Sequence, residues 1–145
     1  KTLGILWGFA GIGSLISSLR LASRQDFSDP KILFSANIAC CVMGLLILGL
    51  SDAMWLLCCA MFLLGFGIST TNILTNILIQ NATVETLRGR AISIYTSTRF
   101  GFDALGGLLV GLLAAWFMPS YVMLVYSALL MLYLLRFLSI KMPEY

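Results

Sequence analysis

Five long runs of apolar residues constrain the fold of this chain more than any other feature of its sequence. They cover residues 3–19, 32–50, 54–79, 91–117 and 121–140. A helix in a soluble protein needs one apolar stripe, whereas these runs are apolar on nearly every face and long enough for a bilayer. Only 10% of the residues are charged, far below the roughly 25% of soluble domains. The sequence therefore predicts an all-α, polytopic membrane bundle with five transmembrane helices in one unit, residues 1–145.

The basic residues predict the direction in which the runs cross the membrane. Apart from Lys1 and from Arg99, which lies inside the fourth run, they all fall on one side, whereas residues 51–53 and 118–120, which form the turns of the other side, contain no Lys or Arg. Because Lys and Arg concentrate in cytoplasmic loops, we expect the amino end outside and the carboxyl end in the cytoplasm. The basic residues of that side are Arg20, Arg24, Lys31, Arg88, Arg90, Arg136 and Lys141.

An odd number of helices that begins outside, with Lys instead of Met at position 1 and no signal-like leader, predicts at least one earlier helix. We therefore expect a carboxyl-terminal fragment. Gly4 and Gly8 in the first run form a pair of small residues four apart, which predicts close packing of a neighbouring helix.

The third run carries polar residues deep within it. Asn72 and Asn76 are four residues apart and share one helical face, with Thr75 beside them. These side chains predict one of two roles. They either bind a substrate by hydrogen bonds or bridge to a neighbouring helix, which contributes a fraction of a kcal/mol up to roughly 2 kcal/mol.

In the fourth run, Arg99 and Asp103 are also four residues apart, about 12 and 18 Å along the helix axis from its start. Ionisable groups at such depth are costly and mark a functional site by default. Gly107 and Gly111 continue the spacing, so we expect the charges and these packing glycines to face protein or a water-filled cavity. Either the pair is structural, or Arg99 reaches the cytoplasmic interface, or Asp103 accepts a proton while Arg99 alternates between Asp103 and an anionic substrate.

Several kinds of chemistry have no support in the sequence. The chain has no His, and its four Cys form the adjacent pairs 40–41 and 58–59, which is not a metal-ligand spacing. One deep Asp without His does not predict a hydrolase, and no nucleotide-binding motif occurs. The net charge of +3 reflects the loops and does not indicate nucleic-acid binding. We expect no metal, no cofactor and no enzymatic activity.

Four stretches resemble the second half of a major facilitator superfamily transporter. In that resemblance the runs correspond to helices eight to twelve of twelve, a partial carboxyl-terminal six-helix bundle. The spacing Asn-x-x-x-Asn-x-x-x-Gln followed by Arg-Gly-Arg resembles the branch that exports drugs, macrolides and siderophores. The four stretches are the glycine-rich first run with RLASR at 20–24, NILTNILIQ at 72–80, Leu87-Arg88-Gly89-Arg90, and ALGGLLVGLLAAW at 104–116.

The resemblance implies secondary active transport by alternating access, with proton-coupled efflux of a small organic molecule across a bacterial inner membrane. Transport of lysophospholipids and a truncated fragment that does not transport are the alternatives. The implied partners are the lipid bilayer, the missing amino-terminal half, the substrate and protons. In the family, Arg20 and Arg24 correspond to a gating-loop motif whose acidic residue is absent here. Arg88, Gly89 and Arg90 correspond to inside gating contacts, or they form an ordinary basic turn.

Overall fold

The computed structural model describes residues 2–23, 30–116 and 118–139, and within them every regular element is an α-helix. The prediction of an all-α chain with five helices is therefore confirmed. Each helix is long and apolar enough to cross a membrane. The helices are α1 (Thr2–Ala22), α2 (Pro30–Leu50), α3 (Met54–Ala82), α4 (Arg88–Trp116) and α5 (Pro119–Ser139).

The helix ends differ from the expected spans by up to three residues, and the difference affects the basic residues. Arg20 lies inside the last turn of α1, and Arg88, Gly89 and Arg90 form the first turn of α4. The expectation that these four residues belong to loops is therefore wrong. Charged residues and glycine can adopt helical backbone at a helix end. Hydropathy marks only the apolar part of a helix and therefore misses these terminal turns. Arg24 lies outside the described residues.

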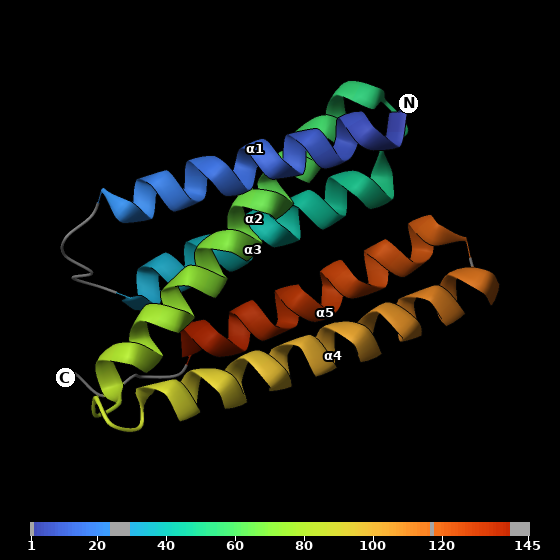
Figure 1. Ribbon diagram of the computed structural model, residues 1–145. Helices are drawn as coiled ribbons and strands as arrows, with labels where there is room; N and C mark the ends of the chain where they lie inside the picture. Colours follow the sequence, from blue (N-terminus) through green and yellow to red (C-terminus); the bar gives the residue numbers. More distant parts are fainter. Residues whose placement is uncertain (1, 24–29, 117, 140–145) are drawn as a thin grey trace.

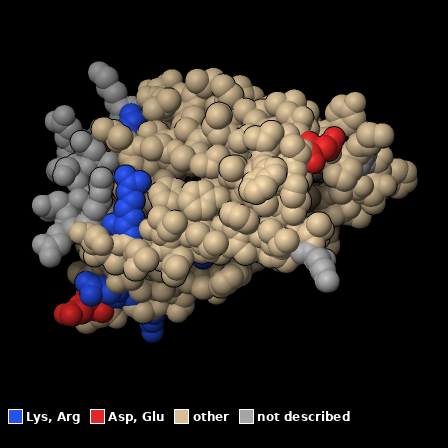
Figure 2. All heavy atoms as spheres, turned by 90° about the horizontal axis from the view of Figure 1, so that it is seen from above, with Lys and Arg blue, Asp and Glu red and all other residues tan. Residues whose placement is uncertain are grey.

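Consecutive helices run in opposite directions, so that their ends gather at two ends of the bundle (Figure 1). One end holds the last turns of α1 and α5 and the first turns of α2 and α4, which together carry Arg20, Lys31, Arg88, Arg90 and Arg136. We call it the basic end. Figure 2 shows the atoms of Lys and Arg collected there on the face it displays. The separation of basic residues expected from the sequence is thus present in the fold.

The central helix is α3, which packs against both α1 and α2, while α2 also packs against α5. Glycines make the closest of these approaches. A methyl group at Gly13 of α1 would overlap the carbonyl oxygen of Phe62, and one at Gly65 of α3 would overlap that of Ala10. Such backbone contact requires residues without a side chain, because every Cβ would hold the two helices apart.

Gly4 and Gly8 do not make such a contact in the described structure, since a methyl group at either would meet no atom within 4 Å. The close approach of α1 and α3 instead lies further along the helix, at Ala10 and Gly13. Ser17, one turn later, is buried and its hydroxyl hydrogen-bonds Thr70 of α3. Since the Thr70 hydroxyl donates to the carbonyl of Phe66, Ser17 is the donor of the pair.

The accessible surface area of this chain is larger than that of a soluble protein of the same mass. The chain exposes 10363 Å² at a mass of 15.9 kDa, whereas a soluble monomer of that mass exposes roughly 7,400 Å². Many large apolar side chains are exposed, among them Trp7, Trp55 and Trp116. Exposed apolar surface on this scale would aggregate in water but is stable against hydrocarbon.

Helix α4 is the least supported element of the bundle. Among the described helices it contacts only α3 and α5, and none of its residues is buried. It lies along one side of the bundle, next to α5 (Figure 1). Its charged side chains, Arg99 and Asp103, are therefore partly accessible from outside the five helices.

Candidate functional site

The charged residues of α4 form an ion pair. Nε of Arg99 lies 3.8 Å from Oδ2 of Asp103, one helical turn further on, and the guanidinium also lies 5.3 Å from the ring centre of Phe100. A charge-assisted hydrogen bond of this type is about 2.7–2.9 Å long. The separation therefore leaves a loose electrostatic contact, which a proton or a second anion can replace.

The position of Arg99 on α4 follows a regular pattern. The less exposed residues of this helix recur every three or four positions, which marks the face that turns toward the other described helices. Arg99 belongs to that face, and Asp103 lies on the same side one turn later. The side chains are 35% and 64% exposed, respectively. The less exposed positions along the face include Ile92, Tyr95, Thr96, Arg99, Gly106, Val110 and Ala114.

The opposite face of α4 consists of strongly exposed apolar residues such as Ile94, Leu105 and Leu108. Gly107 and Gly111 lie between the two faces, and a methyl group at either would meet no described atom within 4 Å. Their predicted role in helix packing therefore has no partner among the five helices. The charged pair and the apolar face nevertheless point in different directions, as a helix between lipid and a polar environment requires.

The polar residues of α3 are mostly satisfied within their own helix. The hydroxyl of Thr75 donates to the carbonyl of Thr71, and the side-chain oxygen of Asn76 accepts a bond from Nε2 of Gln80 at 3.2 Å. Hydroxyls that bond back to the preceding turn are common in membrane helices. Thr75 and Asn76 therefore carry fewer free hydrogen-bonding groups than the sequence suggests.

Asn72 differs from Thr75 and Asn76 because it lines a groove of about 220 Å³ between α2, α3 and α5. The walls of the groove are apolar apart from Asn72 and Thr71, and Arg99 and Asp103 are not among its lining residues. The structure thus does not place the polar residues of α3 and the charged pair of α4 in one cavity. The groove is lined by Ile38, Cys41, Ile68, Thr71, Asn72, Leu130 and Tyr133.

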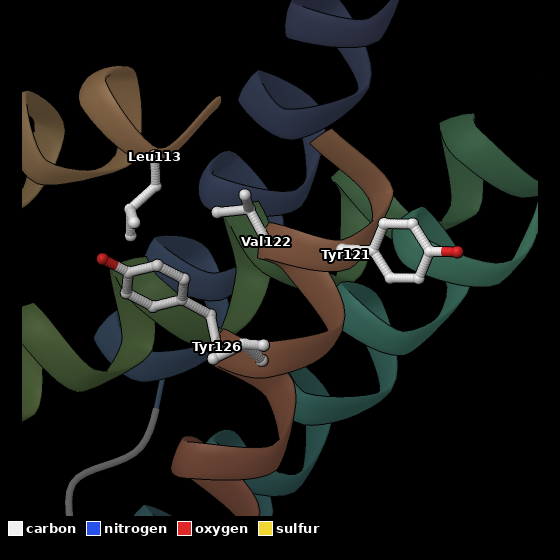
Figure 3. Close-up of a pocket in the computed structure, with 5 residues that line it drawn as sticks. Leu113, Tyr121, Val122 and Tyr126 are labelled. Atoms are coloured by element: carbon white, nitrogen blue, oxygen red, sulfur yellow. The ribbon is translucent and has the colours of Figure 1, made fainter. Parts of the chain in front are cut away.

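A second cavity, of about 190 Å³, separates α4 from α5 near the end opposite the basic end. Figure 3 shows Leu113 of α4 next to the ring of Tyr126, with Val122 to one side of both and Tyr121 turned away. The lining is almost entirely apolar. This cavity suits a hydrocarbon chain or an aromatic ring and offers no charged group for catalysis.

A third cavity, of about 130 Å³, lies between α1, α2 and α3 near the basic end. Arg20, Asn37 and Thr70 provide its polar groups. Asn37 is 3% exposed, and its side-chain Nδ2 has no hydrogen-bond partner in the described structure. The sequence offered one signal for this residue, because a single Asn without a charge interrupts the apolar run 32–50. It could not show that Arg20 and Thr70 would meet Asn37 in space.

At the start of α4, the backbone N–H of Leu87 donates to the carbonyl of Val84, and that of Ala91 donates to Leu87. These bonds make Arg88 the first residue of the helix. Nε of Arg88 is buried without a partner among the described residues, whereas Gly89 and Arg90 are exposed. The three residues expected to act together at a gate are therefore placed in different surroundings.

A comparison with known protein families identifies the family of this chain. A family model described as transmembrane secretion effector matches residues 1–145, which is the whole chain. The chain belongs to this family of the major facilitator superfamily. No curated protein and no solved structure matches it.

Membership in the transmembrane secretion effector family explains why the polar groups lie where they do. The superfamily consists of membrane transporters, so a role in transport across the membrane follows for this chain. A transporter needs charged and polar groups at membrane depth, on faces that water or substrate can reach. In the described structure, Arg99 and Asp103 lie within α4, away from both ends of the helix.

Proposed function

We propose that the chain is the carboxyl-terminal half of a secondary active transporter that exports a small organic molecule by alternating access, driven by protons. The loose contact between Arg99 and Asp103 on the inward-turned face of α4 carries the proposal. The full-length transporter would lie in a bacterial inner membrane, with the basic end of the bundle in the cytoplasm.

The geometry of the pair supports exchange between partners. Two unit charges 3.8 Å apart attract each other by only about 1 kcal/mol in a water-like environment and by about 4 kcal/mol at an effective dielectric constant of 20. A proton on Asp103 removes this attraction and leaves Arg99 free to bind an anionic group of the substrate. The Asp103 carboxylate and the anionic substrate thus compete for the same guanidinium, so that the protonation state of Asp103 and the binding of substrate are linked.

The weak packing of α4 supports alternating access. A helix with no buried residue among the five has little to lose when the surrounding helices rearrange. Transport in this fold requires one bundle to rock against another. We therefore propose that the other half of the transporter packs on the side of α4 that carries Gly107 and Gly111, next to the face of Arg99 and Asp103, and that the substrate lies between the halves.

The test replaces Asp103 by Asn in the full-length protein, reconstituted in liposomes, and measures substrate export against pH. Asn keeps the size of the side chain but cannot accept the proton. We expect export to fall at least tenfold and to lose its dependence on the proton gradient. Asp52→Asn is the matched control, because Asp52 is an exposed acidic residue in the turn between α2 and α3. Export by Asp103→Asn with an unchanged rate and pH profile would remove Asp103 from the mechanism.

A further inference from the structure

The cavity between α1, α2 and α3 contains hydrogen-bond donors that nothing in the described structure uses. Nδ2 of Asn37 is buried and unpartnered, and Arg20 lines the same cavity. A buried polar group without a partner costs about 1–3 kcal/mol, so it persists where something else binds it. Among the described residues, no carboxylate lines this cavity.

Arg20 and the Asn37 amide supply N–H donors to this cavity. The Thr70 hydroxyl already donates to Phe66 and accepts from Ser17, which leaves Arg20 and the Asn37 amide to meet a ligand. An arginine guanidinium has five N–H groups and no acceptor. The guanidinium of Arg20 lies 6.0 Å from the ring centre of Phe66, whose face helps to hold it in place. The cavity therefore selects a ligand that is anionic and accepts several hydrogen bonds.

The location and size of the cavity further limit which anionic ligands it can bind. Arg20 lies in the last turn of α1, at the basic end, where phosphate groups of lipids lie beside a membrane protein. About 130 Å³ accommodates a phosphate group and one or two water molecules, but not a drug-sized molecule. The apolar walls, from Leu21, Leu33 and Phe66, lie around the buried Asn37, whereas Arg20 is exposed and can be reached by an anion from the membrane surface.

We propose that this cavity binds a phosphate group, with Arg20 as the charged contact and Nδ2 of Asn37 as the inner donor. The phosphate belongs either to a membrane phospholipid or to a free anion from the cytoplasm. The site is separate from the Arg99–Asp103 pair, which does not line it. It does not depend on proton coupling and remains testable if Asp103 has no part in transport.

The experiment measures binding to the full-length protein after purification in detergent and removal of lipid. The probes are phosphatidylglycerol, phosphatidylcholine, inorganic phosphate, and diacylglycerol, which has the acyl chains but no phosphate. Native mass spectrometry counts bound lipid, and the rise in melting temperature reports phosphate binding. Affinity for the two phospholipids alone identifies a lipid ligand, and affinity for inorganic phosphate alone identifies a soluble anion. The absence of binding by any phosphate probe, or equal binding of diacylglycerol, overturns the proposal.

Two variants and one control locate the site. Arg20→Gln should weaken phosphate binding roughly ten- to hundredfold, because it removes a charge-assisted contact. Arg136→Gln is the control, since Arg136 is exposed in the last turn of α5 at the same end and does not line the cavity. Equal losses in both variants would show only a diffuse electrostatic effect and overturn the proposal.

Asn37→Leu separates binding from folding. It replaces an unpartnered amide by an apolar side chain of similar size, so the melting temperature without ligand should stay the same or rise. Binding of the phosphate probe should nevertheless fall roughly three- to tenfold. Unchanged binding in Asn37→Leu would exclude the amide from the site and overturn the proposal.

Discussion

The contact between α1 and α3 predicts opposite effects for two glycines that lie two residues apart. A Cβ at Gly13 would overlap the carbonyl oxygen of Phe62 and lie 3.0 Å from the backbone nitrogen of Phe66, whereas a Cβ at Gly11 would meet no atom within 4 Å. Gly13→Ala therefore has to push two backbones apart. Gly11→Ala only adds a methyl group to an open surface.

The magnitudes follow from the groups involved. Overpacking costs about 1–3 kcal/mol, and the upper part of that range applies because backbone cannot rotate away as a side chain can. Separation of the helices also weakens the bond between Ser17 and Thr70, worth about 0.6 kcal/mol and at most about 1.7 kcal/mol in a membrane. Replacement of a helical glycine by alanine returns about 0.5–1 kcal/mol. We expect Gly13→Ala to destabilise by about 2–3 kcal/mol and Gly11→Ala to stabilise slightly.

The assay is the free energy of unfolding of the full-length protein, measured in mixed micelles with increasing amounts of denaturing detergent. A loss of 2 kcal/mol lowers the ratio of folded to unfolded protein about thirtyfold, which this titration resolves. If Gly13→Ala is as stable as Gly11→Ala, the close approach of α1 and α3 at this point is not present and the packing described above is wrong.

Three further predictions follow from the packing. Gly49→Ala should cost less than Gly13→Ala in the same titration, because its Cβ would meet mainly the Leu124 side chain, with Cγ at 2.9 Å and a terminal methyl at 3.0 Å, and a side chain moves aside more easily than backbone. A loss as large as that of Gly13→Ala would contradict this. In variants that keep a single cysteine, Cys59, which is exposed, should react with a lipid-soluble maleimide at least tenfold faster than its buried neighbour Cys58, and equal rates would contradict the orientation of α3. Thr70→Val should cost about 1 kcal/mol because Ser17 loses its acceptor, which the unfolding titration checks and an unchanged stability would contradict.

The sequence predicts the number and type of the helices because residues that face lipid have to be apolar. Transmembrane helices therefore appear in the sequence as long runs of high hydropathy. The turns are predicted less well. Arg88 to Arg90 are polar and look like a loop, yet the first turn of a helix accepts such residues because its N–H groups need no helical partner. Hydropathy therefore places the start of the apolar run correctly at residue 91, but the helix itself starts three residues earlier, at Arg88.

Packing is harder to predict because it depends on which glycines meet a neighbour. Gly4 and Gly8 have the spacing of a packing motif but contact no described helix, whereas Gly13 and Gly65 make the contact. The motif gives the spacing on one helix and contains no information about the partner's position along the axis. The cavity that joins Arg20, Asn37 and Thr70 was invisible for the same reason, since it is made by three separate helices.

The candidate transport site was predictable as a pair but not in its surroundings. Spacing alone places Arg99 and Asp103 one turn apart, and the structure confirms the contact at 3.8 Å. The polar residues of α3 were expected to present free groups, but Thr75 and Asn76 have partners in their own helix and Asn72 lines a different groove. Hydrogen bonds within the same helix determine which polar groups stay available for a substrate, and the sequence alone does not show which of these bonds form.

The most direct test of the proposed transport site asks whether Asp103 faces water. In the full-length protein without its native cysteines, single cysteines replace either Asp103 or Leu108, which lies on the opposite, exposed apolar face of α4. The proposal predicts that Asp103→Cys reacts with a charged, membrane-impermeant thiol reagent and that Leu108→Cys reacts only with a lipid-soluble one. If Asp103→Cys resists the charged reagent and reacts only with the lipid-soluble one, the pair faces lipid and cannot carry protons or substrate.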